Sequence, residues 1–176
     1  MTRIADQRSI VGIDPTSRGL AFAFFESGEF LDWGTRRNDG NELRLLDRLL
    51  DTFKADVLVL EDGDALRSER RPRIRRLLRL MAEHARSRGI VVVTMSRHGV
   101  REEWANRGMT TKHTVSVAIG GMFPEIEMLV PRKRKVYWSE EARAEIFDAI
   151  SLVLHAFPVD AADAGAEQAA LQRTAA

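Results

Sequence analysis

The sequence contains no cysteine and no long apolar run, and both absences exclude whole classes of protein. Without cysteine, the chain has no disulfide framework, no thiolate zinc site and no cysteine nucleophile. None of its apolar runs approaches the roughly 20 residues that a membrane-spanning helix needs. The first residues also lack the apolar core of a secretory signal. We therefore expect a cytoplasmic protein with no membrane partner.

Length and composition indicate one globular domain. The 176 residues suit a single domain of ordinary size. Apolar residues make up 44% of the chain and charged residues 30%, a balance typical of a protein with its own hydrophobic core. The net charge of +1 does not indicate a nucleic-acid partner. The distribution of charge is more informative, because basic residues gather in two stretches, residues 67–79 and 132–135.

The N-terminal part of the chain predicts three strands and the first candidate site residue. Residues 10–13 form a short run rich in β-branched side chains, which is typical of a buried strand. This run ends in a single carboxylate, Asp14, and the proline that follows ends the strand. Two further apolar runs, residues 20–25 and 30–33, are separated by a Ser-Gly pair. We expect these runs to extend the sheet as an antiparallel hairpin.

A second acid follows a second buried strand. Residues 57–60 form a continuous apolar run, which predicts a strand buried on both faces, and Glu61 comes directly after it. Apolar residues recur at helical spacing over residues 41–53 and 68–88, so we expect a helix in each segment. The run 90–95 predicts another buried strand. Strands that alternate with helices in this way favour parallel pairing.

The C-terminal half predicts two more helices. Residues 96–108 are polar, which favours a loop, and Thr110 or Thr111 is then suited to cap a helix. A last helix is expected to begin near Ser139, a capping residue followed by two acids that favour a helix N-terminus. Apolar residues recur along this last helix and predict that one face packs on the core.

Four acids are candidate metal ligands. Glu145 and Asp148 lie three residues apart, so they share one face of the last helix. If this helix packs beside the strands that end in Asp14 and Glu61, the four carboxylates converge. Neighbouring carboxylates repel one another, so such a cluster needs a cation. An all-oxygen ligand set favours Mg²⁺, with Mn²⁺ as a substitute, and a pair of such ions promotes phosphodiester cleavage.

Three motifs together resemble a known nuclease family. They are Gly12-Ile13-Asp14-Pro15, Val59-Leu60-Glu61-Asp62 and Glu145-Ile146-Phe147-Asp148-Ala149-Ile150. In order and spacing they resemble the RuvC family of Holliday junction resolvases, within the RNase H superfamily. The resemblance implies an α/β, RNase H-like fold whose mixed five-stranded sheet is flanked by helices on both faces. It also implies a nuclease domain over residues 1–157, followed by a flexible, alanine-rich tail over residues 158–176.

The resemblance further implies an endonuclease that holds Mg²⁺ through Asp14, Glu61, Glu145 and Asp148 and cuts Holliday junctions or other branched DNA. It implies a homodimer, because symmetrical cutting of two strands needs a two-fold pair of sites. The chain departs from the family at Thr16, where glycine is usual, and at Glu145, where aspartate is common. A non-catalytic nucleic-acid-binding protein with the same fold is therefore the alternative.

Basic side chains are the candidate DNA contacts. We expect phosphate contacts from part of each basic stretch, and the alternative is a solvated surface whose arginines pair with acids. Lys112 matches a basic position of the family and is expected at the scissile phosphate, unless it is an ordinary surface lysine. For Glu61 the alternative is an ion pair with an arginine, and for Asp14 it is a turn cap. The candidate nucleic-acid-binding residues are Arg70, Arg71, Arg73, Arg76, Lys112, Arg132, Lys133, Arg134 and Lys135.

Overall fold

The computed structural model describes residues 8–38, 40–66, 68–132 and 144–158. The predicted start of the last helix, the basic residues 133–135 and nearly all of the C-terminal tail lie outside these ranges. Within them, no helix has the length and apolar character needed to cross a membrane. The elements in chain order are β1 (Ser9–Pro15), β2 (Gly19–Glu26), β3 (Glu29–Arg37), α1 (Glu42–Thr52), β4 (Val57–Glu61), α2 (Pro72–Ser87), β5 (Val91–Met95), α3 (Arg97–Asn106), α4 (Lys112–Met122), the 3-10 helix η1 (Pro124–Leu129) and α5 (Ala144–Ala156).

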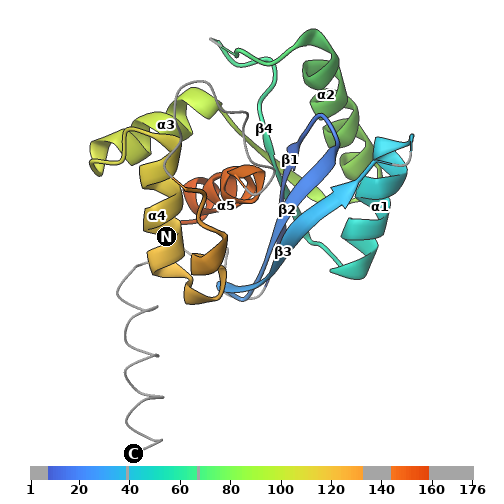
Figure 1. Cartoon of the computed structure of the whole chain (residues 1–176). Helices are drawn as coiled ribbons and strands as arrows, with labels where there is room; N and C mark the ends of the chain where they lie inside the picture. Colours follow the sequence, from blue (N-terminus) through green and yellow to red (C-terminus); the bar gives the residue numbers. More distant parts are fainter. Residues whose placement is uncertain (1–7, 39, 67, 133–143, 159–176) are drawn as a thin grey trace, which may run out of the picture.

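The five strands form one mixed sheet in the order β3-β2-β1-β4-β5 (Figure 1). β1 pairs antiparallel with β2, and β2 pairs antiparallel with β3. β4 joins the other side of β1 in parallel, and β5 joins β4 in the same way. This topology confirms the predicted sheet of three antiparallel strands extended by two parallel ones. β1 is therefore the central strand.

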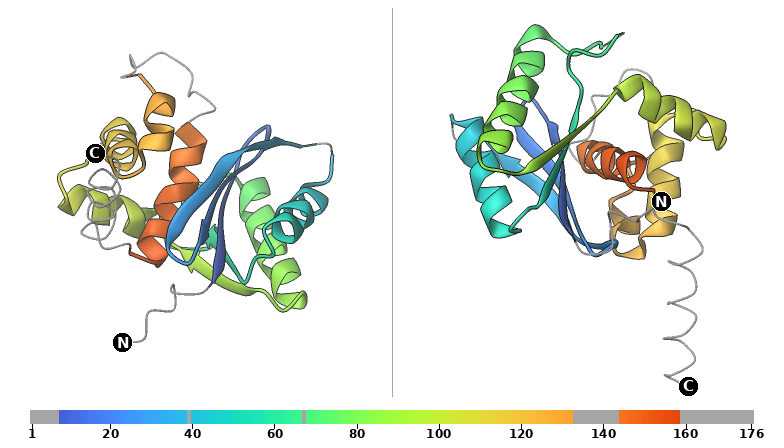
Figure 2. Two further views of the ribbon diagram at one scale, coloured as in Figure 1. Left: turned by 90° about the horizontal axis from the view of Figure 1, so that it is seen from below. Right: turned by 180° about the vertical axis from the view of Figure 1, so that it is seen from behind.

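Helices cover both faces of the sheet, as predicted (Figures 1 and 2). α1 and α2 pack on one face, where Val11 and Ile13 of β1 join their core. α5 packs on the opposite face, where Ile10 contributes to a core that includes Phe147 and Ile150. Successive strand residues point to opposite faces, which explains why the uniformly apolar β1 serves both cores. α3 and α4 pack against α5, and η1 packs against α4.

α5 approaches β1 so closely that only glycine fits at position 12. A Cβ atom at Gly12 would lie 2.4 Å from Cγ2 of Val153 and 2.8 Å from the backbone oxygen of Ala149. Both distances are shorter than van der Waals contact, and the second involves backbone, which cannot rotate away. Glycine therefore permits the approach that brings Asp148, the neighbour of Ala149, towards the end of β1.

Two predictions, the start of one helix and the burial of one strand, are wrong for identifiable reasons. α2 begins at Pro72 rather than at residue 68, because the residue before a proline avoids the helical conformation. Arg71 accordingly has φ −59° and ψ 146°, which is extended backbone. β5 is not a buried strand, because it lies at the edge of the sheet, where Val91 is 49% exposed. A run of apolar residues predicts a strand but does not distinguish a central position from an edge.

The expectation of a loop over residues 96–108 is also wrong, because α3 forms there. The hydroxyl of Ser96 caps this helix by accepting a hydrogen bond from the Gly99 amide at 2.9 Å. Val100 and Trp104, four residues apart, form its buried stripe. Two apolar anchors among charged residues are a weak sequence signal, but they are sufficient once α5 supplies a surface to pack against.

An ion-pair network joins α1 to α2 and gives the fold a testable pH dependence. The carboxylate of Asp47 lies 2.7 Å from Nε2 of His84 and 2.5 Å from Nη1 of Arg88. Burial raises the pKa of Asp47, but hydrogen bonds from His84 and Arg88 outweigh burial and hold this pKa below its ordinary value of 3.8. The charged carboxylate therefore stabilises the fold above that value, and the contribution is lost as the pH falls through the lowered pKa.

We expect Asp47→Asn to lower the melting temperature at about pH 6 and to have a smaller effect at about pH 3, because below the ordinary pKa of 3.8 the stabilisation by the charged carboxylate declines as the pH falls towards the lowered pKa. The loss at the higher pH should correspond to less than about 1 kcal/mol, because the pair is partly exposed to solvent. Thermal unfolding followed by circular dichroism at both pH values is the measurement. The same decrease at both values would contradict the assignment of the lowered pKa.

Candidate functional site

Three of the four predicted acids meet at one edge of the sheet. β1 and β4 are parallel neighbours, and Ile13 pairs with Leu60 in their register. The residues that follow this pair, Asp14 and Glu61, therefore lie side by side at the carboxyl ends of the two strands. Asp148 reaches the same place from α5, because α5 packs across β1. The convergence predicted from the motifs is present for these three acids.

The two strand acids are buried, and burial raises the free-energy cost of ionising them. Asp14 and Glu61 are each only 2% exposed, whereas the side chain of Asp148 is 23% exposed. A carboxylate removed from water is strongly destabilised unless a cation or hydrogen-bond donors face it. The cluster therefore needs counter-charges, and the chain supplies them from two arginines and one lysine.

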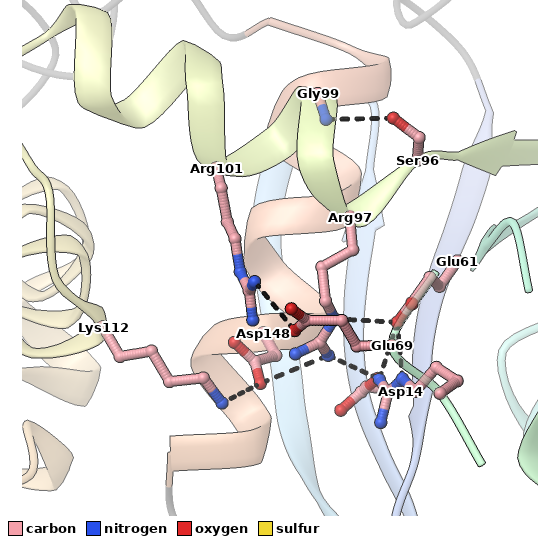
Figure 3. A network of polar contacts seen from close by, with 10 residues as sticks. Asp14, Glu61, Glu69, Ser96, Arg97, Gly99, Arg101, Lys112 and Asp148 are labelled. Atoms are coloured by element: carbon pink, nitrogen blue, oxygen red, sulfur yellow. Dashed lines mark hydrogen bonds and ion pairs between the residues drawn. The ribbon is translucent and has the colours of Figure 1, made fainter. Parts of the chain in front are cut away.

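Arg70 and Arg97 bind the buried carboxylates directly, and Figure 3 shows Arg97 beside Glu61 and Asp14. Nε of Arg70 donates to Oε2 of Glu61 at 2.8 Å, and its Nη2 donates to Oδ1 of Asp14. Nε of Arg97 donates to the same Glu61 oxygen at 3.0 Å, and its Nη2 lies 3.5 Å from Oδ1 of Asp14. Nη2 of Arg97 also lies 3.6 Å from Oδ2 of Asp148. The two guanidinium groups thus connect all three acids.

Lys112 completes the cluster from the opposite side. Its Nζ donates to Oδ2 of Asp148 at 3.0 Å (Figure 3). Lys112 is the first residue of α4, and the Thr111 side chain caps this helix through a reciprocal hydrogen-bond pair with Thr114. The cap fixes the backbone that carries the lysine. The lysine predicted for the scissile phosphate therefore lies beside the acids.

Burial and charge act in opposite directions on Asp14. The pKa of Asp14 is raised to about 7, chiefly by burial. The charges of Arg70 and Arg97 oppose this rise, whereas the negative charge of nearby Asp148 adds to it. For Arg97, burial lowers the pKa, but the charges of Asp14, Asp148 and Glu61 outweigh burial and raise it. At neutral pH the arginines are therefore fully charged, whereas burial works against ionisation of the Asp14 carboxyl.

Glu145 faces the same cleft as the other acids. It lies in the first turn of α5, and it lines a cleft of about 460 Å³ together with Asp14, Arg70, Lys112 and Asp148. The cleft is open to solvent beside the buried carboxylates. The structure therefore brings the fourth predicted acid to the site, at a more exposed position than Asp14 and Glu61.

The predicted DNA-binding arginines occupy different environments. Arg70 contacts the acids, and Arg73 forms an ion pair with Glu42 at 2.9 Å while lining the same cleft. Arg71 lines the cleft and is exposed. Arg76 and Arg132 are exposed as well. Lys133, Arg134 and Lys135 lie outside the described residues, so DNA contact stays a prediction for the whole set.

The sequence-based prediction missed Arg97. This residue follows β5, which is the parallel neighbour of β4, with Glu61 opposite Met95. A side chain two residues beyond that pair reaches the edge at which the acids gather. The position was available from strand order, but the segment was expected to form a loop. The arginine pairing that was the alternative for Glu61 is present, and it involves two arginines rather than one.

The donor chemistry of the site fits Mg²⁺. Carboxylates are hard oxygen ligands of the kind that Mg²⁺ prefers. Oε1 of Glu61 is buried with no hydrogen-bond partner among the described residues, so one ligand atom is available. Over residues 8–38, 40–66, 68–132 and 144–158, however, no group of three or more acidic or histidine side chains forms a ready-made metal site. The arginines occupy carboxylate oxygens of Asp14 and Glu61 that a cation would use as ligands.

Comparisons with solved structures identify the fold. Thermus thermophilus RuvC matches with a TM-score of 0.57 and 16% sequence identity, over 85% of this chain and 93% of that protein. T. thermophilus RuvC in complex with a Holliday junction substrate matches with a TM-score of 0.55 and 16% identity, over 86% and 94%. The yeast mitochondrial Holliday junction resolvase matches with a TM-score of 0.55 and 14% identity, over 85% and 78%. No protein-family model and no curated protein sequence matches this chain.

These matches confirm the fold that the three motifs predicted. The chain has the RuvC fold, with an open mixed sheet flanked by helices, across most of its described length. Sequence identities of 14–16% support no residue-level transfer from these proteins. Chemistry at the site therefore depends on the carboxylates, the arginines and the lysine themselves.

Proposed function

We propose that this chain is a divalent-metal-dependent endonuclease that cuts Holliday junctions or other branched DNA. The observation that carries the proposal is the convergence of Asp14, Glu61 and Asp148 at the carboxyl ends of β1 and β4. The RuvC fold supports the choice of nucleic acid as substrate, because the matching proteins are junction resolvases.

In this proposal, Asp14, Glu61 and Asp148 hold Mg²⁺ or Mn²⁺, and Glu145 completes the ligand set from the rim of the cleft. When bound, the metal supplies an activated water and stabilises the leaving oxygen of the phosphodiester. Lys112 is aimed at the same centre and neutralises charge on the scissile phosphate. A divalent cation on Asp14 would favour the charged form of this carboxyl and so would oppose the effect of burial on its pKa.

Exposed arginines beside the cleft provide phosphate contacts that position the DNA. Arg71 and Arg73 line the cleft itself, and Arg76 extends the basic surface along α2. Arg132 leads into the second basic run, residues 132–135, for which we propose the same role. Two copies of the chain acting as a homodimer in the cytoplasm would cut both strands of a junction symmetrically.

Cleavage of a labelled four-way junction tests this function, with duplex and single-stranded DNA as controls and with Mg²⁺, Mn²⁺ or EDTA present. We expect junction-selective cutting that needs either metal and is absent in EDTA. Tight junction binding without cutting in either metal would contradict the nuclease proposal. That result would instead identify the non-catalytic DNA-binding protein, an alternative supported by the arginines that hold the acids.

We expect Lys112→Gln to slow metal-dependent cleavage by about a hundredfold, since it removes one cation from the reacting phosphate. Lys112→Arg keeps the charge and should restore much of the rate. The α4 backbone should be unaffected, because the cap is made by Thr111 and Thr114. Single-turnover rates on the junction provide the measurement, and a wild-type rate for Lys112→Gln would contradict the role of this lysine.

A further inference from the structure

The acidic site already contains its own cations. Arg70 and Arg97 place two positive charges among Asp14, Glu61 and Asp148, and their contacts converge on Oε2 of Glu61 and Oδ1 of Asp14. A divalent ion that uses these oxygens as ligands competes with both guanidinium groups for the same atoms. It also meets strong repulsion from them at short range in a site shielded from water.

We propose that Arg70 and Arg97 are gating residues, which occupy the acidic site in the metal-free protein and must leave their carboxylates before a divalent cation binds. The inference rests on the proposed function, because it concerns loading of the same site. The two arginines stabilise the buried acids when no metal is bound. Displacing them costs free energy, and this cost weakens the apparent affinity of the site for metal.

The unpaired oxygen of Glu61 supports this assignment independently. Both arginines bind Oε2, while Oε1 is buried without a hydrogen-bond partner among the described residues. A permanent arginine–glutamate pair normally uses both carboxylate oxygens, because the guanidinium fork matches them. The arrangement instead leaves one acceptor unsatisfied at a buried position. A metal ion bound by this carboxylate would satisfy the unpaired oxygen.

The surroundings of Arg70 allow it to leave. It lies before α2, in a segment that is neither helix nor strand, and its side chain borders the open cleft with 19% exposure. Arg97 is different, because its backbone is held at the first turn of α3 by the Ser96 cap. Only the side chain of Arg97 is able to rotate. Arg70 is therefore the principal gate, and Arg97 is the second.

Binding of Mn²⁺ to the full-length protein without DNA tests the gate. Isothermal titration calorimetry should show Arg70→Gln binding Mn²⁺ at least about tenfold more tightly than wild type, because one competing charge is gone. Arg86→Gln removes the same charge from an exposed position on α2 and should leave the affinity unchanged. Equal or weaker binding by a folded Arg70→Gln variant, with folding checked by circular dichroism, would overturn the proposal.

Melting temperatures give a second readout. In EDTA, Arg70→Gln should melt below wild type, because Asp14 and Glu61 lose a counter-charge. Saturating Mn²⁺ should raise its melting temperature by more than it raises that of wild type. If Arg70→Gln does not fold, Arg97→Gln takes its place, with exposed Arg86→Gln again as the control, and equal Mn²⁺ affinities of Arg97→Gln and wild type would overturn the gate.

This experiment separates the gate from the proposed nuclease. It contains no DNA, so a chain that cuts nothing still shows tighter Mn²⁺ binding in Arg70→Gln if the gate exists. If the wild-type chain cuts junctions but Arg70→Gln binds Mn²⁺ with the wild-type affinity, the nuclease proposal stands and the gate proposal is wrong.

Discussion

Asp148→Asn should lower the single-turnover rate of junction cleavage by roughly a thousandfold or more while leaving junction binding nearly unchanged. The substitution keeps the size of the side chain but removes the negative charge that a metal ligand needs. Asp148 is the most accessible of the three converging acids, and its contacts with Lys112 and Arg97 are partly exposed. Their loss should therefore cost little stability, so the fold remains while chemistry stops.

The control for Asp148→Asn is Asp51→Asn on α1, which removes an equal charge from an exposed ion pair with Arg88. Its cleavage rate should equal that of wild type. Asp14→Asn should lose activity as Asp148→Asn does, because both acids serve one centre. Cleavage by Asp148→Asn within tenfold of wild type, measured in Mg²⁺ on the same junction, would show that this acid is not an essential ligand.

The second large effect is expected at Gly12, where the fold and the site depend on the same contact. Gly12→Ala places a methyl group 2.4 Å from Val153 and 2.8 Å from the backbone oxygen of Ala149, so α5 must shift away from β1. Overpacking of this kind costs about 1–3 kcal/mol of unfolding free energy. Because α5 carries Asp148, we also expect cleavage to fall even under conditions in which the variant is folded.

Urea unfolding measures the stability loss, with Gly121→Ala as the matched control. Gly121 lies on an exposed face of α4. Apart from its chain neighbours and the adjacent backbone of α4, no described atom lies within 4 Å of an added Cβ. Alanine there should raise stability by about 0.5–1 kcal/mol, since glycine is a poor helix former. Equal stability of Gly12→Ala and wild type would refute the close approach of α5 to β1.

The sheet and the positions of the acids were predictable because they depend on near neighbours in the chain. An apolar run closed by Asp14 or Glu61 indicates where a strand stops, and parallel strands bring their ends to one edge. The apolar periodicity of α5 similarly indicates its buried face. Asp148 lies among Phe147, Ala149 and Ile150, and this places it at the boundary of that face.

The counter-charges were not predictable in this way. Arg97 follows Asp14 by 83 residues and Glu61 by 36 residues, and it meets them only because β5 runs beside β4. Arg70 belongs to a stretch of similar arginines, and nothing in the local sequence distinguishes it from Arg71. Pairing between distant charges depends on the finished tertiary structure. The pattern of charges therefore indicated a basic surface, but it did not indicate that Arg70 and Arg97 pair with the buried acids.

The most direct test of metal binding at this site is a crystal structure of the chain grown with Mn²⁺ at the concentration used for cleavage, with the metal located by anomalous scattering. We predict that Mn²⁺ is bound by Asp14, Glu61 and Asp148 and that the Arg70 guanidinium no longer contacts Asp14. Junction cleavage under the same conditions, with both arginines still on the carboxylates and Mn²⁺ absent from them, would contradict it.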